Sequence, residues 1–140
     1  MAAKFAFDAI AQGTAYEVAP FGIETVIVMP GPFTHGTEHF PAADHASGED
    51  VARQYAKLDP LVARYGEATE SLFREGADAD PRAVADELVR LLALPMGEKP
   101  ERSVVDFTDS GVEQVNDVHR ASAVDYLTRM GYPELLGVRG

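Results

Sequence analysis

The first place to look for chemistry in this chain is the loop that follows an apolar segment. Residues 26–29 read Val-Ile-Val-Met, an uninterrupted apolar run typical of a strand covered on both faces. Pro30 has no N–H to donate to a sheet, so we expect the strand to end there. In open α/β sheets, ligands bind beyond the carboxyl ends of the strands. The loop beginning at Pro30 is therefore the first candidate for a binding site.

Three of the four histidines, His35, His39 and His45, lie in the loop-rich stretch 32–50 and raise the question of a metal site. Asp44 lies directly beside His45, and the spacing matches no known ligand set. We therefore predict no metal site and interpret these histidines as solvent-facing loop residues. A lone histidine in such a loop is an equally weak candidate for acid–base chemistry.

The candidate loop must be positioned by the elements on either side of it. Residues 1–18 have helical spacing, with one face of small and apolar residues that we expect to pack: Ala2, Phe5, Ala6, Ala9, Ile10 and Gly13. Pro20 and Gly22 end this helix. A strand at about 23–29 follows, so the chain runs from helix to turn to strand.

Two Asp-Pro pairs mark helix starts after the loop, because a carboxylate cap followed by proline suits the first helical turn. A short helix at 49–58 precedes the first pair, Asp59-Pro60. The second pair, Asp80-Pro81, opens a strongly amphipathic helix that ends before Pro95. We expect its apolar stripe to be core packing: Val84, Leu88, Leu91 and Leu92.

The remaining elements are a second strand and a last helix. The strand is predicted at about 102–107, and the helix at about 112–130, capped by Thr108, Asp109 or Ser110 and stopped by Gly131. We expect the tail to Gly140 to be loose.

Composition limits the partners that the protein can have. The chain has 140 residues, a formal net charge of −11 and no cysteine. The charge argues against nucleic acid and against an anionic membrane surface, and the missing cysteines exclude disulfides and thiolate chemistry. No apolar run approaches a membrane span and no signal peptide is recognisable, so a cytoplasmic protein is expected.

The two predicted strands are too few to make a stable sheet by themselves. Two strands separated by helices imply parallel pairing through a right-handed crossover, and hence an α/β fold that is mostly helical. Such a two-stranded sheet has two open edges and little covered area. The missing strands would come from a lost N-terminal region, from another chain, or from an unusual repacking.

Three segments resemble the C-terminal half of short-chain dehydrogenases/reductases: Met-Ala-Ala-Lys-Phe-Ala-Phe-Asp-Ala-Ile at 1–10, Tyr-Glu-Val-Ala-Pro-Phe-Gly-Ile at 16–23 and Val-Met-Pro-Gly-Pro-Phe at 28–33. The segment from Asp80-Pro81 to Leu94, and the turn and strand at 94–105, are similar to the helix, turn and seventh strand of one branch of this family. The resemblance covers residues 1–107, weakly across the middle loop, and is absent after about residue 109.

This resemblance implies one partial domain over 1–140: the C-terminal part of a Rossmann-type, doubly wound parallel sheet, followed by a helical tail at 108–140. The strand at 23–29 would be the sixth of seven. The family's Gly-rich dinucleotide loop, catalytic Ser and Asn belong to the N-terminal half and have no counterpart here. The chain would thus be a truncated family member.

Lys4 matches the family's active-site lysine, while the family's Tyr, four residues earlier, would fall one position before Met1. A Tyr and a Lys at that spacing share a helix face, and the ammonium lowers the pKa of the phenol. The phenol then exchanges a proton with the substrate while the nicotinamide carries the hydride. In the family the Lys also binds the nicotinamide ribose, so the resemblance implies a catalytic and cofactor-binding role for Lys4. The alternative is a plain solvated lysine.

The resemblance also implies cofactor contacts in the loop after the first strand. The nicotinamide side would be approached by Pro30, Gly31, Pro32 and Phe33, most closely at Gly31, which has no side chain. The family's Thr, four residues after the Gly, is His35 here, and Thr34 and Thr37 beside it are the candidates to replace it. The alternative is that the loop only ends the strand.

The implied function is an NAD(P)-dependent oxidoreductase acting on an alcohol or carbonyl group of a small molecule. Because the Gly-rich loop and the Tyr are missing, we expect no independent turnover from these 140 residues. The sequence indicates neither the substrate nor whether the cofactor is NAD or NADP. The alternative is a catalytically inactive α/β fragment that acts by protein association, with a homodimer through the 1–18 helix as one form.

Overall fold

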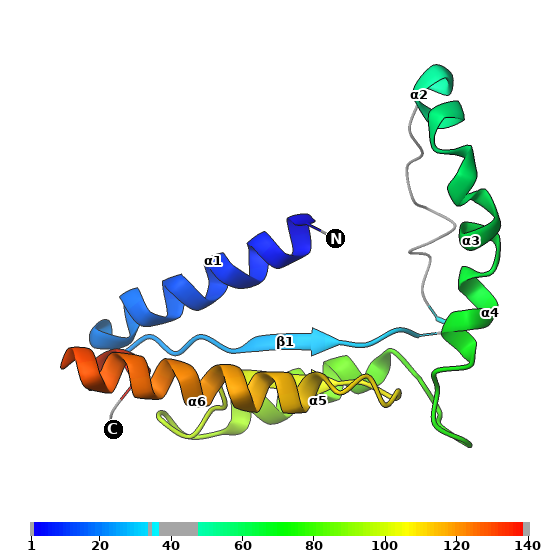
Figure 1. The fold of residues 1–140 in the computed structure, drawn as a ribbon. Helices are drawn as coiled ribbons and strands as arrows, with labels where there is room; N and C mark the ends of the chain where they lie inside the picture. The colour runs from blue at the N-terminus through cyan, green and yellow to red at the C-terminus, as the bar shows by residue number, and fades with distance from the viewer. Residues whose placement is uncertain (1, 34, 37–47, 139–140) are drawn as a thin grey trace. The chain divides into compact units, whose positions relative to one another are not determined.

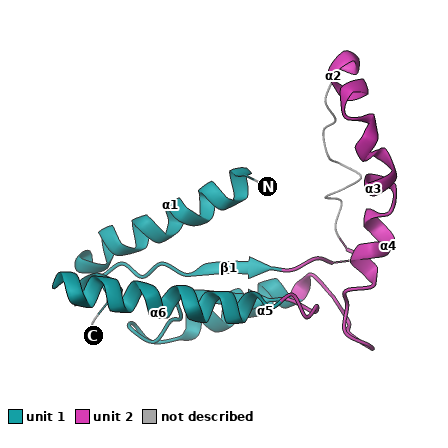
Figure 2. Ribbon diagram, viewed as in Figure 1, with its two compact units in different colours: residues 1–30, 83–105, 111–140 teal, residues 31–82, 106–110 magenta. Residues whose placement is uncertain are grey.

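The computed structural model describes residues 2–33, 35–36 and 48–138 (Figure 1). They belong to two compact units (Figure 2). Unit 1 comprises residues 1–30, 83–105 and 111–140, and unit 2 comprises residues 31–82 and 106–110. The fold class is α/β and mostly helical, as the sequence predicts.

Unit 1 contains the sheet, which has two parallel strands, β1 (Ile27–Pro30) and β2 (Arg102–Val105). The register pairs Ile27 with Arg102 and Pro30 with Val105. The two predicted parallel strands are therefore confirmed, each shorter than expected, and β1 ends on its proline. Among the described residues, no strand pairs with the other edge of β1.

Helices lie on both faces of this sheet. Successive strand residues face opposite sides. The Ser103 hydroxyl meets Glu87 of the crossover helix, whereas Arg102 meets Asp8 of the first helix and Met29 meets Asn116 of the last. The helices of unit 1 are α1 (Ala2–Val18), α5 (Arg82–Ala93) and α6 (Val112–Met130), with short 3-10 turns η1 (Ala19–Phe21) and η3 (Pro133–Leu136). Thus α5 lies on one face, and α1 and α6 lie on the other (Figure 1).

The face that α1 turns toward the sheet is not the predicted one. All six residues of the expected packing face, Ala2, Phe5, Ala6, Ala9, Ile10 and Gly13, are exposed. The half-buried stripe instead carries Asp8, Gln12 and Tyr16. Asp8 bonds to Arg102 on β2, and Gln12 bonds to Tyr16, to Glu101 just before β2 and to His119 on α6. Polar pairing outweighs apolar periodicity here, because the strand opposite α1 begins with Arg102 and is preceded by Glu101.

The apolar core of unit 1 is small. Its buried apolar residues are Ala19, Leu91 and Val105, and β1 is half-buried rather than covered on both faces. The expected core stripe of α5 is wrong in large part, because Leu91 is buried but Leu92 is 79% exposed. A sheet of two strands is too narrow to cover the apolar face of a twelve-residue helix.

The structure confirms the predicted end of α6 but corrects the predicted cap at its start and the predicted loose tail after it. Gly131 ends the helix with a left-handed φ of 85°, which glycine adopts without strain. At the start, Gly111 occupies the capping position and no side chain caps the helix, because the Ser110 hydroxyl bonds to Asp106 instead. The tail is not loose over 133–136, where η3 packs against α1 and η1.

Unit 2 holds the short helices between the two strands. Asp59 begins a helix with Pro60 in its first turn, as predicted, and Phe73 forms an antiparallel bridge with Thr108. Apart from Thr69, side chains from residue 48 to 70 are exposed. The elements are α2 (Glu49–Gln54), η2 (Ala56–Leu58), α3 (Asp59–Ala63) and α4 (Tyr65–Glu70).

None of the helices in the described part of the chain is both long and apolar enough to cross a bilayer.

Candidate functional site

The segment that follows β1 packs, within unit 2, against the segment that follows β2. A Cβ placed on Gly31 would overlap the carboxylate of Asp106, so only glycine fits there. The Phe33 and Phe107 rings meet edge to face with their centroids 6.0 Å apart. The two strand-end segments therefore form one packed layer around Gly31.

Asp106 organises this layer through its side chain. Oδ1 accepts hydrogen bonds from the Thr108 amide at 2.9 Å and from its hydroxyl at 2.8 Å, and Oδ2 accepts one from the Ser110 hydroxyl at 2.6 Å. Burial raises the pKa of Asp106, but these hydrogen bonds and nearby Arg74 outweigh burial and hold it below its ordinary value. Asp106 is therefore a charged acceptor that fixes the loop.

Arg74 holds the same layer from its outer side. Its guanidinium donates to the backbone carbonyl of Asp106 at 2.7 Å and to that of Phe107 at 3.3 Å, and its own amide donates to Phe107 at 3.0 Å. Sequence patterns missed this contact, because it joins positions more than thirty residues apart. The position of Asp106, Phe107 and Thr108 directly after a predicted strand was the one sequence feature that could have indicated a structured loop here.

The other predicted site residues are divided between the two units. Lys4 lies exposed in the first turn of α1, and Pro30 lies exposed at the end of β1, both in unit 1. Gly31, Pro32 and Phe33 belong to unit 2 and are half-buried. Thr34 and Thr37 lie outside the described residues.

The histidine loop is described only in part. His35 lies 3.8 Å from Asp78 in an exposed pair, whereas His39 and His45 lie outside the described residues. Where the structure describes the chain, no three His, Asp or Glu side chains gather as metal ligands.

The strand-end loop has one feature of a ligand site in an α/β sheet. Gly31 directly follows a parallel strand, where ligands of such sheets bind. However, the space that Gly31 leaves open is faced by Asp106, and the sequence has no Gly-rich loop for the pyrophosphate. The open side of Gly31 is therefore occupied, and the sequence has no counterpart of that loop.

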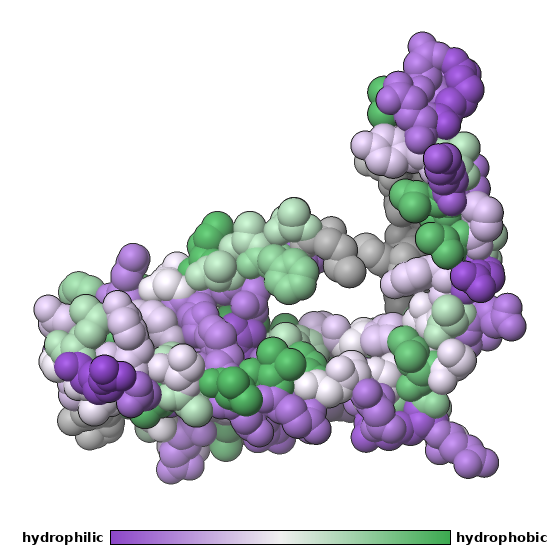
Figure 3. Space-filling view, viewed as in Figure 1, coloured by the Kyte–Doolittle hydropathy of each residue, from purple (hydrophilic) through white to green (hydrophobic). Residues whose placement is uncertain are grey.

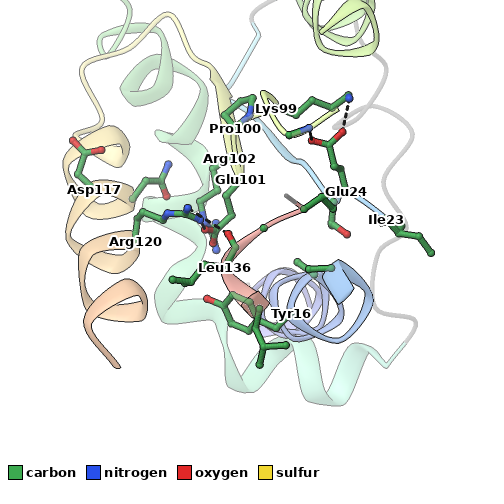
Figure 4. A pocket seen from close by; sticks show the side chains of 18 residues that line it. Tyr16, Ile23, Glu24, Lys99, Pro100, Glu101, Arg102, Asp117, Arg120 and Leu136 are labelled. Carbon is green, nitrogen blue, oxygen red and sulfur yellow. Dashed lines mark hydrogen bonds and ion pairs between the residues drawn. The ribbon is translucent and has the colours of Figure 1, made fainter. Parts of the chain in front are cut away.

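Unit 1 contains a cavity that the sequence did not predict (Figure 4). It has a volume of about 400 Å³ and lies at the amino ends of β1 and β2, the opposite end of β1 from Pro30. Its wall is formed by the end of α1, by α6, by the segments that enter the two strands and by the C-terminal segment. Its lining residues include Tyr16, Glu24, Lys99, Glu101, Arg120 and Leu136.

Acid–base pairs line this cavity. Lys99 Nζ lies 2.5 Å from Glu24 Oε2, and Arg120 pairs with Glu101. The hydrogen bond from Lys99 holds the pKa of Glu24 below its ordinary value. Burial, with Glu101 nearby, raises the pKa of Tyr16, so its phenol stays protonated at neutral pH.

A third pair, Arg102 with Asp8, joins β2 to α1 beside the cavity. The guanidinium makes two parallel bonds, Nη1 to Oδ1 at 2.6 Å and Nη2 to Oδ2 at 2.9 Å, and its side chain is only 10% exposed. These bonds lower the pKa of Asp8 and raise that of Arg102. The sequence spacing could have indicated this polar face of α1, since Asp8, Gln12 and Tyr16 lie four residues apart and share one side of the helix.

Comparison with known proteins leaves the chain unassigned, since no protein-family model matches it and no curated protein matches it either.

Proposed function

We propose that this chain corresponds to the C-terminal portion of an NAD(P)-dependent oxidoreductase of the short-chain dehydrogenase/reductase type, acting on an alcohol or carbonyl group of a small molecule. The observation that carries the proposal is the parallel strand β1, which ends on Pro30 and passes directly to Gly31. Ligands of α/β sheets bind beyond such strand ends. The sheet is then part of a larger Rossmann-type sheet.

In this proposal the chain's own residues act at the nicotinamide end. Backbone groups of Pro30, Gly31 and Phe33 orient the ring, and the Lys4 ammonium binds the ribose hydroxyls and lowers the pKa of a neighbouring phenol. Thr34 or Thr37 contacts the carboxamide. The cofactor, when bound, supplies the hydride.

The first test is the reading frame upstream of the Met1 codon. We expect a Tyr codon directly before it and a Gly-rich β-α-β unit further upstream. The longer product should oxidise NADH or NADPH with carbonyl substrates, whereas the 140-residue chain should show no turnover. An upstream frame without either feature would contradict the proposal.

A second candidate function is association without catalysis, and the exposed apolar surface of unit 1 favours it. Figure 3 shows hydrophobic surface along α1, where Phe7 and Ile10, three residues apart on one face, are 70% and 66% exposed. Monomeric proteins rarely expose apolar side chains in such groups. This candidate is a homodimer through the 1–18 helix.

Light scattering after size-exclusion chromatography tests this association. A homodimer predicts twice the 15.1 kDa chain mass for the unaltered protein and a monomer for Phe7→Asp. Val51→Asp, at an exposed site in unit 2, is the matched control and should stay dimeric. A monomeric unaltered protein would exclude this candidate.

A further inference from the structure

The cavity of unit 1 is balanced in charge. Three acids and three bases line its wall: Glu24 pairs with Lys99, Glu101 pairs with Arg120, and the other two are Asp117 and Arg102. Arg102, the third base, is neutralised by Asp8. A phosphate or a simple cation would meet both signs of charge within a few ångströms, so the wall disfavours a ligand with only one charge.

The wall still has hydrogen-bonding groups to offer. Tyr16 accepts a bond from Gln12 at 2.8 Å, which leaves its own proton to donate. Arg120 uses Nη1 toward Glu101 and Nη2 toward the Leu136 carbonyl, so its Nε–H takes no part in either contact. These two donors belong to α1 and α6, and both suit a carboxylate.

Glu24 supplies the opposite chemistry. It precedes β1, and its carboxylate accepts bonds from the Gly97 amide at 2.7 Å, from the Lys99 ammonium and from the Lys99 backbone amide. A carboxylate has about four lone-pair sites, so one site remains that can accept from an ammonium group. Figure 4 shows Glu24 and Lys99 on one side of the cavity, with Arg120 and Glu101 on the other.

Apolar groups complete the wall. Ile23, Leu135 and Leu136 line it together with Ala19. The volume of about 400 Å³ lies in the range of small-molecule sites, roughly 300–1,000 Å³. The cavity thus offers donors for a carboxylate, an acceptor for an ammonium group and an apolar surface.

We propose that this cavity binds a small zwitterion, an α-amino acid with an apolar side chain. The carboxylate lies toward Arg120 and Tyr16, the ammonium group toward Glu24, and the side chain against Leu135 and Leu136. The site is separate from the strand-end loop, so this proposal does not depend on the oxidoreductase proposal.

Three matched ligands test the proposal on the unaltered full chain: L-leucine, N-acetyl-L-leucine, which lacks the ammonium, and L-leucinamide, which lacks the carboxylate. Saturation-transfer NMR and calorimetry should detect L-leucine binding below about 10 mM, with each analogue at least about tenfold weaker. Absence of L-leucine binding at that concentration would overturn the proposal. So would equal binding of either analogue.

Variants then locate the site. Arg120→Gln and Glu24→Gln should each weaken L-leucine binding about tenfold. Arg129→Gln removes an exposed pair with Asp125 on the same helix, away from the cavity, and should leave binding within about twofold. An equal loss in Arg129→Gln, or no loss in the two cavity variants, would overturn the assignment. The ligand series on the unaltered chain stays decisive if a variant misfolds.

Discussion

At the scale of single residues, Gly31 is constrained by its neighbour. Gly31→Ala places a Cβ against the Asp106 carboxylate, which is fixed by three hydrogen bonds, so we expect unfolding free energy to fall by about 1–3 kcal/mol. Urea denaturation measures this change. Gly13→Ala is the control, because nothing lies within 4 Å of its Cβ and alanine favours a helix interior. Equal stability of Gly31→Ala and the unaltered chain would show that this contact is absent.

Glu87 makes stability depend on pH. Hydrogen bonds from Arg90 and from Ser103 lower its pKa from 4.5 to about 2. Because the folded pKa is the lower one, ionised Glu87 stabilises the fold fully above about pH 4.5, and this contribution is lost as the pH falls toward 2. Unfolding free energy measured from pH 7 to pH 2.5 should therefore decline less steeply in Glu87→Gln. Identical pH profiles would contradict this assignment.

At the scale of elements, α1 is tied to β2 by a polar contact. Asp8→Asn leaves the guanidinium of Arg102 without its counter-ion, and we expect a loss of about 2–3 kcal/mol. This is below the value for a fully buried pair because the Asp8 side chain is 37% exposed. The control Asp125→Asn breaks an exposed pair in α6 and should cost at most about 0.5 kcal/mol. Similar losses in both variants would contradict a special role for the Asp8–Arg102 pair.

Local patterns predicted the elements well and their packing poorly. Proline and glycine fixed the end of β1 and the end of α6, because their effects act within one turn of chain. The face of α1 was wrong, because Asp8 and Arg102 lie 94 positions apart and periodicity carries no information about such pairs. For the same reason, the sequence patterns did not predict the contact of Arg74 with the strand-end loop or the cavity beside Tyr16.

At the scale of the molecule, the parts that can be described lack a large core. None of the described side chains combines large volume with complete burial, while apolar residues on α1 and α5 are exposed. The apolar sequence of β1 already indicated that a two-stranded sheet would leave apolar surface uncovered, since such a strand needs neighbours on both sides. Each of the two proposed functions would cover this exposed apolar surface with another stretch of polypeptide.

The central proposal is that Lys4 contributes to binding NADH or NADPH, and cofactor affinity measured by nicotinamide fluorescence tests it most directly. The product extended upstream of Met1 should bind one cofactor with a Kd below about 100 μM, and the 140-residue chain should not. In the extended product, Lys4→Ala should weaken binding about tenfold and the exposed control Lys57→Ala should not. Equal affinity of Lys4→Ala and the unaltered protein, or tight binding by the 140-residue chain alone, would contradict the claim.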